Sequence, residues 1–92
     1  MTEQVSARHI LVPTLAEAMA ARERITELNE DFGQVAQELS KCPSSHMGGA
    51  LGTFGKGQMV KPFEDAAFSS EIGKVSLPVQ TQFGYHLIQR TA

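Results

Sequence analysis

The chain has 92 residues, a hydrophobic fraction of 41% and a formal net charge of -2, which fit one small globular domain with a modest core. The excess of acidic over basic residues argues against general nucleic-acid binding, which needs a concentrated basic face. No apolar run approaches the ~20 residues of a membrane span, so we expect no membrane partner. We expect a single domain over residues 1–92, with 1–6 as a short flexible tail.

Cysteine usage favours a reducing compartment. Cys42 is the only cysteine, so no internal disulfide can form and the fold does not depend on oxidation. The first seven residues are polar and lack the apolar stretch of a signal peptide. We therefore expect a cytoplasmic protein, and since nothing in the sequence indicates self-association, a monomer.

The first half of the chain predicts one strand and two helices. Residues 8–12 are rich in branched apolar side chains, as in a short strand. Thr14 followed by Glu17 is a capping pattern that begins a helix, and Asp31 begins a second helix that must end before Pro43. Helical spacing predicts that the buried faces of these helices carry Ala18, Ala21, Ile25 and Leu28, and then Phe32, Val35, Ala36 and Leu39.

The second half predicts three strands and one helix. The glycine-rich stretch 48–57 indicates a strand over 51–54 with tight bends, and Pro62 fits the first turn of a short helix whose inner face carries Phe63, Ala66 and Ala67. Residues 75–79, interrupted by a proline, suit an edge strand, and 85–90 suit a central strand. The order β-α-α-β-α-β-β predicts an α+β domain with helices packed around an antiparallel sheet.

Five segments carry a family resemblance in their order and spacing. They are HILV (9–12), SKCPS (40–44), GGALG (48–52), GQMVKPF (57–63) and TQFGYHLI (81–88). Together they resemble the parvulin family of peptidyl-prolyl cis/trans isomerases. The resemblance implies a parvulin-like (FKBP-like) four-stranded antiparallel sheet surrounded by helices. It also implies an enzyme that acts on proline-containing peptides and unfolded protein segments, assists folding and needs no cofactor.

The resemblance also implies a site. His9 and His86 match the family's paired histidines, and Thr81 matches the hydroxyl beside them. Cys42 matches a position that holds cysteine in some members and aspartate in others. The implied pocket for the proline ring comprises Leu51, Met59, Phe63 and Phe83.

These residue types suit rotation about an X–Pro bond. The barrier of ~18–20 kcal/mol comes from amide resonance, and no bond has to break. An apolar pocket can hold the ring, while polar groups around the carbonyl favour the twisted amide. We expect the two histidines and Thr81 to form a network that sets the state of Cys42. Because the family accepts aspartate at this position, we rank a non-covalent role for Cys42 above nucleophilic attack.

The connection after the first strand bears on specificity. Family members directed at phosphorylated serine or threonine carry a basic loop there, whereas this chain has only Pro13-Thr14 and no Lys or Arg until Arg22. A phosphate normally needs such donors. We expect substrates with an uncharged, non-phosphorylated residue before proline.

The sequence also allows other roles for these residues and for the domain. The histidines could be purely structural, Cys42 could be an inert buried thiol, and the domain could bind peptides as a chaperone module without catalysis. A zinc site would need Cys42 and His46 together with the histidine pair, but structural zinc usually needs two local ligand pairs, so we expect no metal. The glycine-rich stretch lacks the P-loop pattern, because Ala50 and Gly57 replace required residues.

Overall fold

The computed structural model describes residues 3–92. Its elements, in chain order, are β1 (Gln4–Val12), α1 (Leu15–Thr26), α2 (Phe32–Leu39), the 3-10 helix η1 (Pro43–Met47), β2 (Ala50–Gly55), α3 (Lys61–Ser69), β3 (Val79–Thr81) and β4 (Gly84–Arg90). The predicted α+β order is confirmed, with η1 as an addition.

The four strands form one antiparallel sheet in the order β2-β1-β4-β3. β1 and β4 are the two central strands, and their register places His9 opposite Ile88 and Leu11 opposite His86. β4 buries His86, Leu87 and Ile88 in succession, as expected for a strand covered on both faces. The position predicted for the last strand is therefore confirmed.

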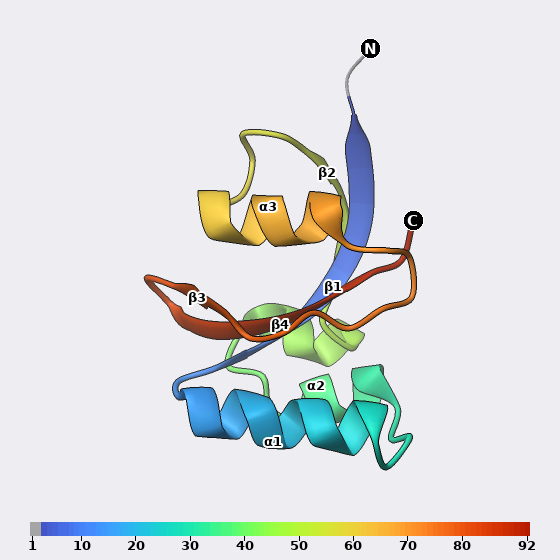
Figure 1. Ribbon diagram of the computed structural model, residues 1–92, viewed down its shortest axis with the longest axis vertical. Helices are drawn as coiled ribbons and strands as arrows, with labels where there is room; N and C mark the ends of the chain where they lie inside the picture. The colour runs from blue at the N-terminus through green and yellow to red at the C-terminus, as the bar shows by residue number, and fades with distance from the viewer. Residues whose placement is uncertain (1–2) are drawn as a thin grey trace.

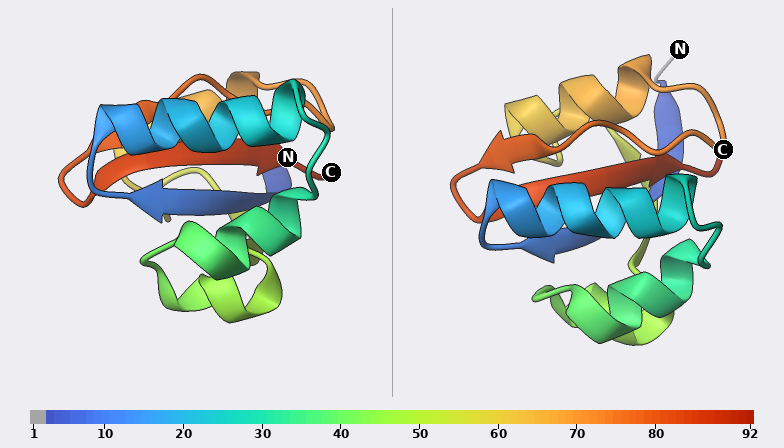
Figure 2. Two further views of the ribbon diagram at one scale, coloured as in Figure 1. Left: turned by 90° about the horizontal axis from the view of Figure 1, so that it is seen from below. Right: turned by 60° about the horizontal axis from the view of Figure 1, so that its bottom comes forward.

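The helices cover both faces of the sheet (Figures 1 and 2). α1 and α2 lie on one face, over a core that contains Ile10 and Leu87. α3 lies on the other face, over a second core that contains Phe54, Phe63 and Ile88. Because side chains alternate along a strand, His9 and His86 point to the α3 face, and the site lies there.

Two helices begin at the predicted caps. The Thr14 hydroxyl accepts a hydrogen bond from the Glu17 amide at 3.2 Å, and an Asp31 carboxylate oxygen accepts one from the Gln34 amide at 3.0 Å. Such caps satisfy amides that have no partner inside the helix. None of the helices among residues 3–92 has the length and apolar character needed to cross a membrane.

The predicted flexible tail is wrong for residues 4–6. β1 begins at Gln4, where the chain already pairs with Gly55 of β2, and Val5 is buried in the α3-side core. The alternation of Val5, Ala7 and His9 on one face extends the strand beyond the apolar run that predicted it. Residues 1–2 lie outside the described part of the chain.

Two further expectations need correction. Leu28 is 63% exposed and not core, because α1 ends at Thr26 and the chain turns at Asn29, which has a φ of 57°. The edge strand β3 spans 79–81 and not 75–79. Pro78 has no N–H to donate to the ladder, so before it only an isolated bridge joins Val75 to Gln89.

Candidate active site

The centre of the site is a pair of nearly coplanar, hydrogen-bonded histidines on the two central strands. The Nδ1 atoms of His9 and His86 lie 2.9 Å apart, and the rings are 5.1 Å apart with an interplanar angle of 16°. Their relative exposures are 5% and 4%. The antiparallel register of β1 and β4 fixes this contact, since both side chains leave the same face of neighbouring strands.

Thr81 extends this contact into a hydrogen-bonded chain. Its hydroxyl lies 2.7 Å from Nε2 of His86 and accepts a hydrogen bond from the Phe83 amide at 3.2 Å. A neutral imidazole has one donor and one acceptor nitrogen, so the chain from Thr81 through His86 to His9 runs consistently in either direction with one proton on each ring. The network orients both rings and holds the β3–β4 turn that carries Phe83.

Burial keeps both rings neutral at neutral pH. The pKa of His9 is lowered from 6.5 to about 4, first by burial and then by repulsion from a charge on His86. Burial also lowers the pKa of His86. Nε2 of His9 is buried without a hydrogen-bond partner among residues 3–92, which adds to the cost of placing a charge on this ring.

The neutral histidines predict a loss of stability in mild acid. In the unfolded chain a histidine titrates near 6.5. The stabilisation is thus fully present above that pH, and it is lost as the pH falls from 6.5 towards the folded pKa of about 4. We expect the free energy of unfolding to decrease by about 2 kcal/mol between pH 7 and pH 5 through His9 alone, with a further decrease from His86. Urea denaturation at the two pH values measures this change.

The exposed histidine His46 provides a control for this prediction. The H46Q variant removes a histidine from η1 and should retain the full pH dependence, whereas H9L should show a smaller one. Carboxylates titrate mostly below this window. Equal unfolding free energies at pH 7 and pH 5 in the unmodified chain would show that the pair is not held neutral.

A glycine allows the chain to approach the backbone of His9 closely. The His9 amide donates a hydrogen bond to the Gly49 carbonyl at 2.9 Å. A Cβ at position 49 would lie 2.2 Å from the His9 carbonyl oxygen, and the φ of Gly49 is +85°. Only glycine fits both constraints. The sequence motif GGALG therefore fixes the position of His9 on its β2 side.

An open groove of about 520 Å³ lies over the histidine pair. Phe63 of α3 forms one wall, and its ring is nearly perpendicular to both histidine rings, at centroid distances of 5.4 and 5.3 Å. Phe83 is 61% exposed at the turn between β3 and β4. The groove is lined by His9, Leu11, Lys41, Cys42, Pro43, Leu51, Gln58, Met59, Val60, Phe63, Phe83 and His86.

Cys42 reaches this groove because its segment is attached to the sheet edge. β2 stops pairing with β1 at Arg8, and beyond that point the Ser40 hydroxyl accepts a hydrogen bond from the Leu11 amide at 3.0 Å. The Lys41 amide donates to the Leu11 carbonyl at 2.8 Å. Among residues 3–92 no hydrogen bond joins the Cys42 thiol to the histidines, so the expected link from the network to Cys42 is absent in this structure.

The structure brings the residues predicted for the site together. All of them line the groove except Thr81, which lies behind His86 and contacts it directly. The prediction omitted Leu11, Lys41, Pro43 and Val60, and gave no role to Gln58. Strand alternation with His9 could have indicated Leu11. Among residues 3–92 no three His, Cys, Asp or Glu side chains converge in a group that could hold a metal ion.

Comparison with known proteins links this geometry to a family. The sequence model of the rotamase family, described as the PPIC-type PPIase domain, matches residues 9–92. The foldase protein PrsA of Geobacillus kaustophilus is 44% identical over 89 residues, which cover 96% of this chain and 31% of that protein. The chain thus spans under a third of the length of the foldase relatives that it matches.

Shorter relatives match over more of their length. The peptidyl-prolyl cis-trans isomerase Pin1 of Arabidopsis thaliana is 46% identical over 71 residues, covering 77% of this chain and 60% of that protein. The solution structure of NmPin, the parvulin of Nitrosopumilus maritimus, superposes with a TM-score of 0.88 at 45% identity, covering 100% of this chain and 99% of that one.

Proposed function

The chain belongs to the PPIC-type rotamase family, the parvulin-type peptidyl-prolyl isomerases, and from this premise we propose that it accelerates cis/trans isomerisation of X–Pro bonds in flexible or unfolded protein segments and so assists their folding. One observation carries the proposal: an apolar groove opens directly over a buried, neutral and hydrogen-bonded histidine pair. Such a site can hold a prolyl ring and exclude water from the amide that turns.

The apolar wall supplies the hold on the ring. Phe63 is buried and fixed against both histidines, and Met59 is half-buried beside it. Aromatic rings offer rigid contact surfaces, and methionine adapts to an irregular shape. Removing water from the amide disfavours its planar form, because the resonance that makes the amide planar also makes it more polar.

The polar wall acts on the rotating carbonyl. Cys42 lines the same groove as the aromatic residues, and its thiol is a weak S–H donor that can approach the carbonyl oxygen. The histidines and Thr81 keep the floor of the groove in one geometry and need not exchange protons during turnover. A 10⁴-fold acceleration requires about 5.5 kcal/mol of preference for the twisted amide, which a dry cradle and a few oriented dipoles can supply.

The test is an isomerisation assay on a short Xaa-Pro peptide. Exchange between the cis and trans signals, followed by NMR at catalytic concentrations of the protein, should be accelerated well beyond the uncatalysed rate of tens to hundreds of seconds. Binding of the peptide without acceleration would leave the domain as a peptide-binding chaperone module, the alternative that shares this fold.

The non-covalent role of Cys42 leads to a separate prediction. The C42D variant should retain isomerase activity within roughly an order of magnitude, because a carboxylate also presents a polar group to the carbonyl while it removes the thiol nucleophile. Rates of the C42D and C42A variants on one peptide measure this. If folded C42D were inactive, with its circular dichroism unchanged, the covalent mechanism would be favoured.

Substrate class and setting complete the proposal. The connection between β1 and α1 is only Pro13-Thr14, and the next arginine along the chain, Arg22, donates to the Ser76 carbonyl at 3.1 Å. Among the described residues that line the groove, Lys41 is the one Lys or Arg, which is fewer donors than a phosphate requires. We propose that the substrates are not phosphorylated and that the protein acts as a monomer. The free thiol of Cys42 is compatible with the reducing cytoplasm that we propose as its location.

A further inference from the structure

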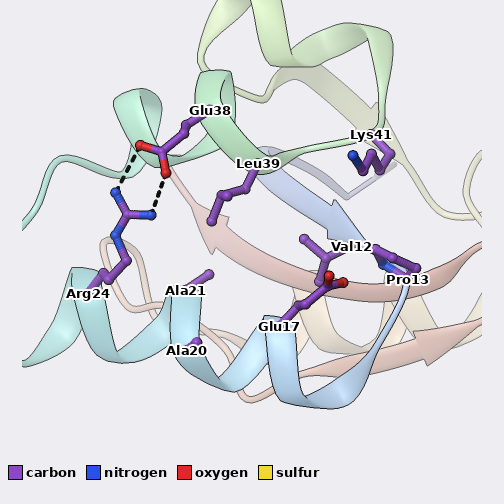
Figure 3. A pocket seen from close by; sticks show the side chains of 9 residues that line it. All are labelled: Val12, Pro13, Glu17, Ala20, Ala21, Arg24, Glu38, Leu39 and Lys41. Carbon is purple, nitrogen blue, oxygen red and sulfur yellow. Dashed lines mark hydrogen bonds and ion pairs between the residues drawn. The ribbon is translucent and has the colours of Figure 1, made fainter.

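Lys41 lies at the junction of two cavities. The segment 40–42 passes from the end of α2 around the free edge of β1 to the groove. Lys41 therefore lines the groove and also a second cavity of about 290 Å³ between α1 and α2. Figure 3 shows this second cavity, with Lys41 on the opposite side from the pair formed by Arg24 and Glu38.

Lys41 is the only Lys, Arg, Asp or Glu among the described residues that line the groove. The two histidines are uncharged at neutral pH, because their pKa values are lowered. At neutral pH, Lys41 therefore carries the one formal charge among the described residues that line the groove, and this charge is positive.

The Lys41 ammonium is available to a ligand. It forms no ion pair within the part of the chain that the structure describes. Glu38 in the second cavity is held by Arg24 at 2.8 Å. Glu17 also lines that cavity, but no ion pair joins it to Lys41. An exposed, unpaired cation at the rim of an apolar groove favours a substrate that brings the opposite charge.

We propose that Lys41 is a specificity-determining residue that favours substrates with a carboxylate side chain immediately before the proline. The inference rests on the proposed function. Lys41 directly precedes Cys42 in the groove lining, and in this proposal both residues lie beside the residue before proline, on the acyl side of the rotating bond. This proposal replaces the expectation of an uncharged residue before proline, and it keeps the expectation that this residue is not phosphorylated.

A carboxylate fits this single cation better than a phosphate does. A phosphoserine carries a charge of about -1.5 to -2 and three acceptor oxygens, and one ammonium can neither neutralise it nor satisfy it. Aspartate or glutamate matches the charge of Lys41. Because Lys41 is exposed, we expect a preference of roughly two- to fivefold, the range of exposed ion pairs, and we expect salt to weaken it.

The experiment compares kcat/KM for four peptides that differ only in the residue before proline: glutamate, glutamine, leucine and phosphoserine. The ratio of kcat/KM for the glutamate peptide to that for the glutamine peptide measures the effect of the side-chain charge, because the two side chains have nearly the same shape. In the unmodified chain this ratio should be about two to five at low salt and should approach one at high salt.

Two variants assign the effect to Lys41. K41M should bring the ratio to about one, and K41E should invert it. The matched control is K74M, which removes an exposed lysine from the loop before β3, outside the groove lining. K74M changes the net charge by the same amount and should keep the ratio of the unmodified chain.

The outcomes separate the two proposals. No acceleration of any peptide would refute the isomerase function. Acceleration with equal kcat/KM for glutamate and glutamine, or an equal loss of the ratio in K74M and K41M, would overturn the role of Lys41 alone. A phosphoserine peptide turned over more than tenfold faster than the glutamate peptide would overturn the choice of a carboxylate.

Discussion

Replacing Phe63 with leucine is expected to lower kcat/KM for X–Pro isomerisation by about tenfold or more, equivalent to about 1.4 kcal/mol of transition-state stabilisation. Phe63 packs nearly perpendicular to both histidine rings and forms one wall of the groove. Leucine is the informative substitution, since Phe63→Ala would cost about 3–5 kcal/mol of stability. A domain of this size has a total stability of about 5–15 kcal/mol.

Phe68 provides the matched control on the same helix. Both phenylalanines pack on Phe54, at centroid distances of 6.1 and 6.3 Å, but Phe68 lies away from the groove. F68L should destabilise the domain by less than F63L does, because Phe68 is only partly buried, and it should retain activity within about twofold. Equal activity losses in the two variants would show that packing of α3, and not the groove wall, limits the rate.

Replacing Gly49 with alanine is expected to destabilise the domain by about 3 kcal/mol or more, through a clash that the native backbone cannot relieve. The added Cβ would lie 2.2 Å from the His9 carbonyl oxygen, so β1 or the segment before β2 must move. The movement should also displace His9 from His86 and lower the activity of the fraction that remains folded. Urea denaturation and the peptide assay measure the two effects.

The G52A variant serves as a control that has the backbone strain of a left-handed alanine but not the clash. The φ of Gly52 is +75°, similar to that of Gly49, but a Cβ there would meet nothing within 4 Å. G52A should therefore cost only the left-handed conformation, about 1–2 kcal/mol. If G49A and G52A were equally stable, the close approach to His9 would not constrain the fold.

The sequence predicted the parts of the fold that depend on local chemistry. The helix caps predicted at Thr14 and Asp31 both form, through hydrogen bonds from backbone amides to their side chains. Alternation along β4 placed His86 and Ile88 on one face, and both lie on the α3 side. Local patterns of this kind are governed by contacts within a few residues, and such contacts are visible in a single sequence.

Features that depend on tertiary contacts were predicted less well. The first residues of β1 are largely polar, and their pairing with β2 is apparent only once the sheet is assembled. Leu28 fits the helical pattern but lies beyond the end of α1. The start of β3 depends on Pro78, whose effect on the ladder can be placed only after the partner strand is known.

The site was predicted from the family resemblance more than from the residues alone. No spacing rule links His9, Cys42 and His86, which come from three separate segments. The sequence could not show that Lys41 lines both the groove and the cavity between α1 and α2. This placement depends on the path of residues 40–42 around the edge of the sheet. The sequence therefore indicated part of the lining of the groove but not the charged residue in it.

The most direct test of the groove is an amide chemical-shift titration with a short proline peptide, using as control the same peptide with alanine in place of proline. We predict that the proline peptide perturbs the amides of Cys42, Leu51, Met59 and Phe83, around the groove, and that the control peptide perturbs them much less. Perturbations centred on the cavity between α1 and α2, or the same response to both peptides, would contradict this prediction.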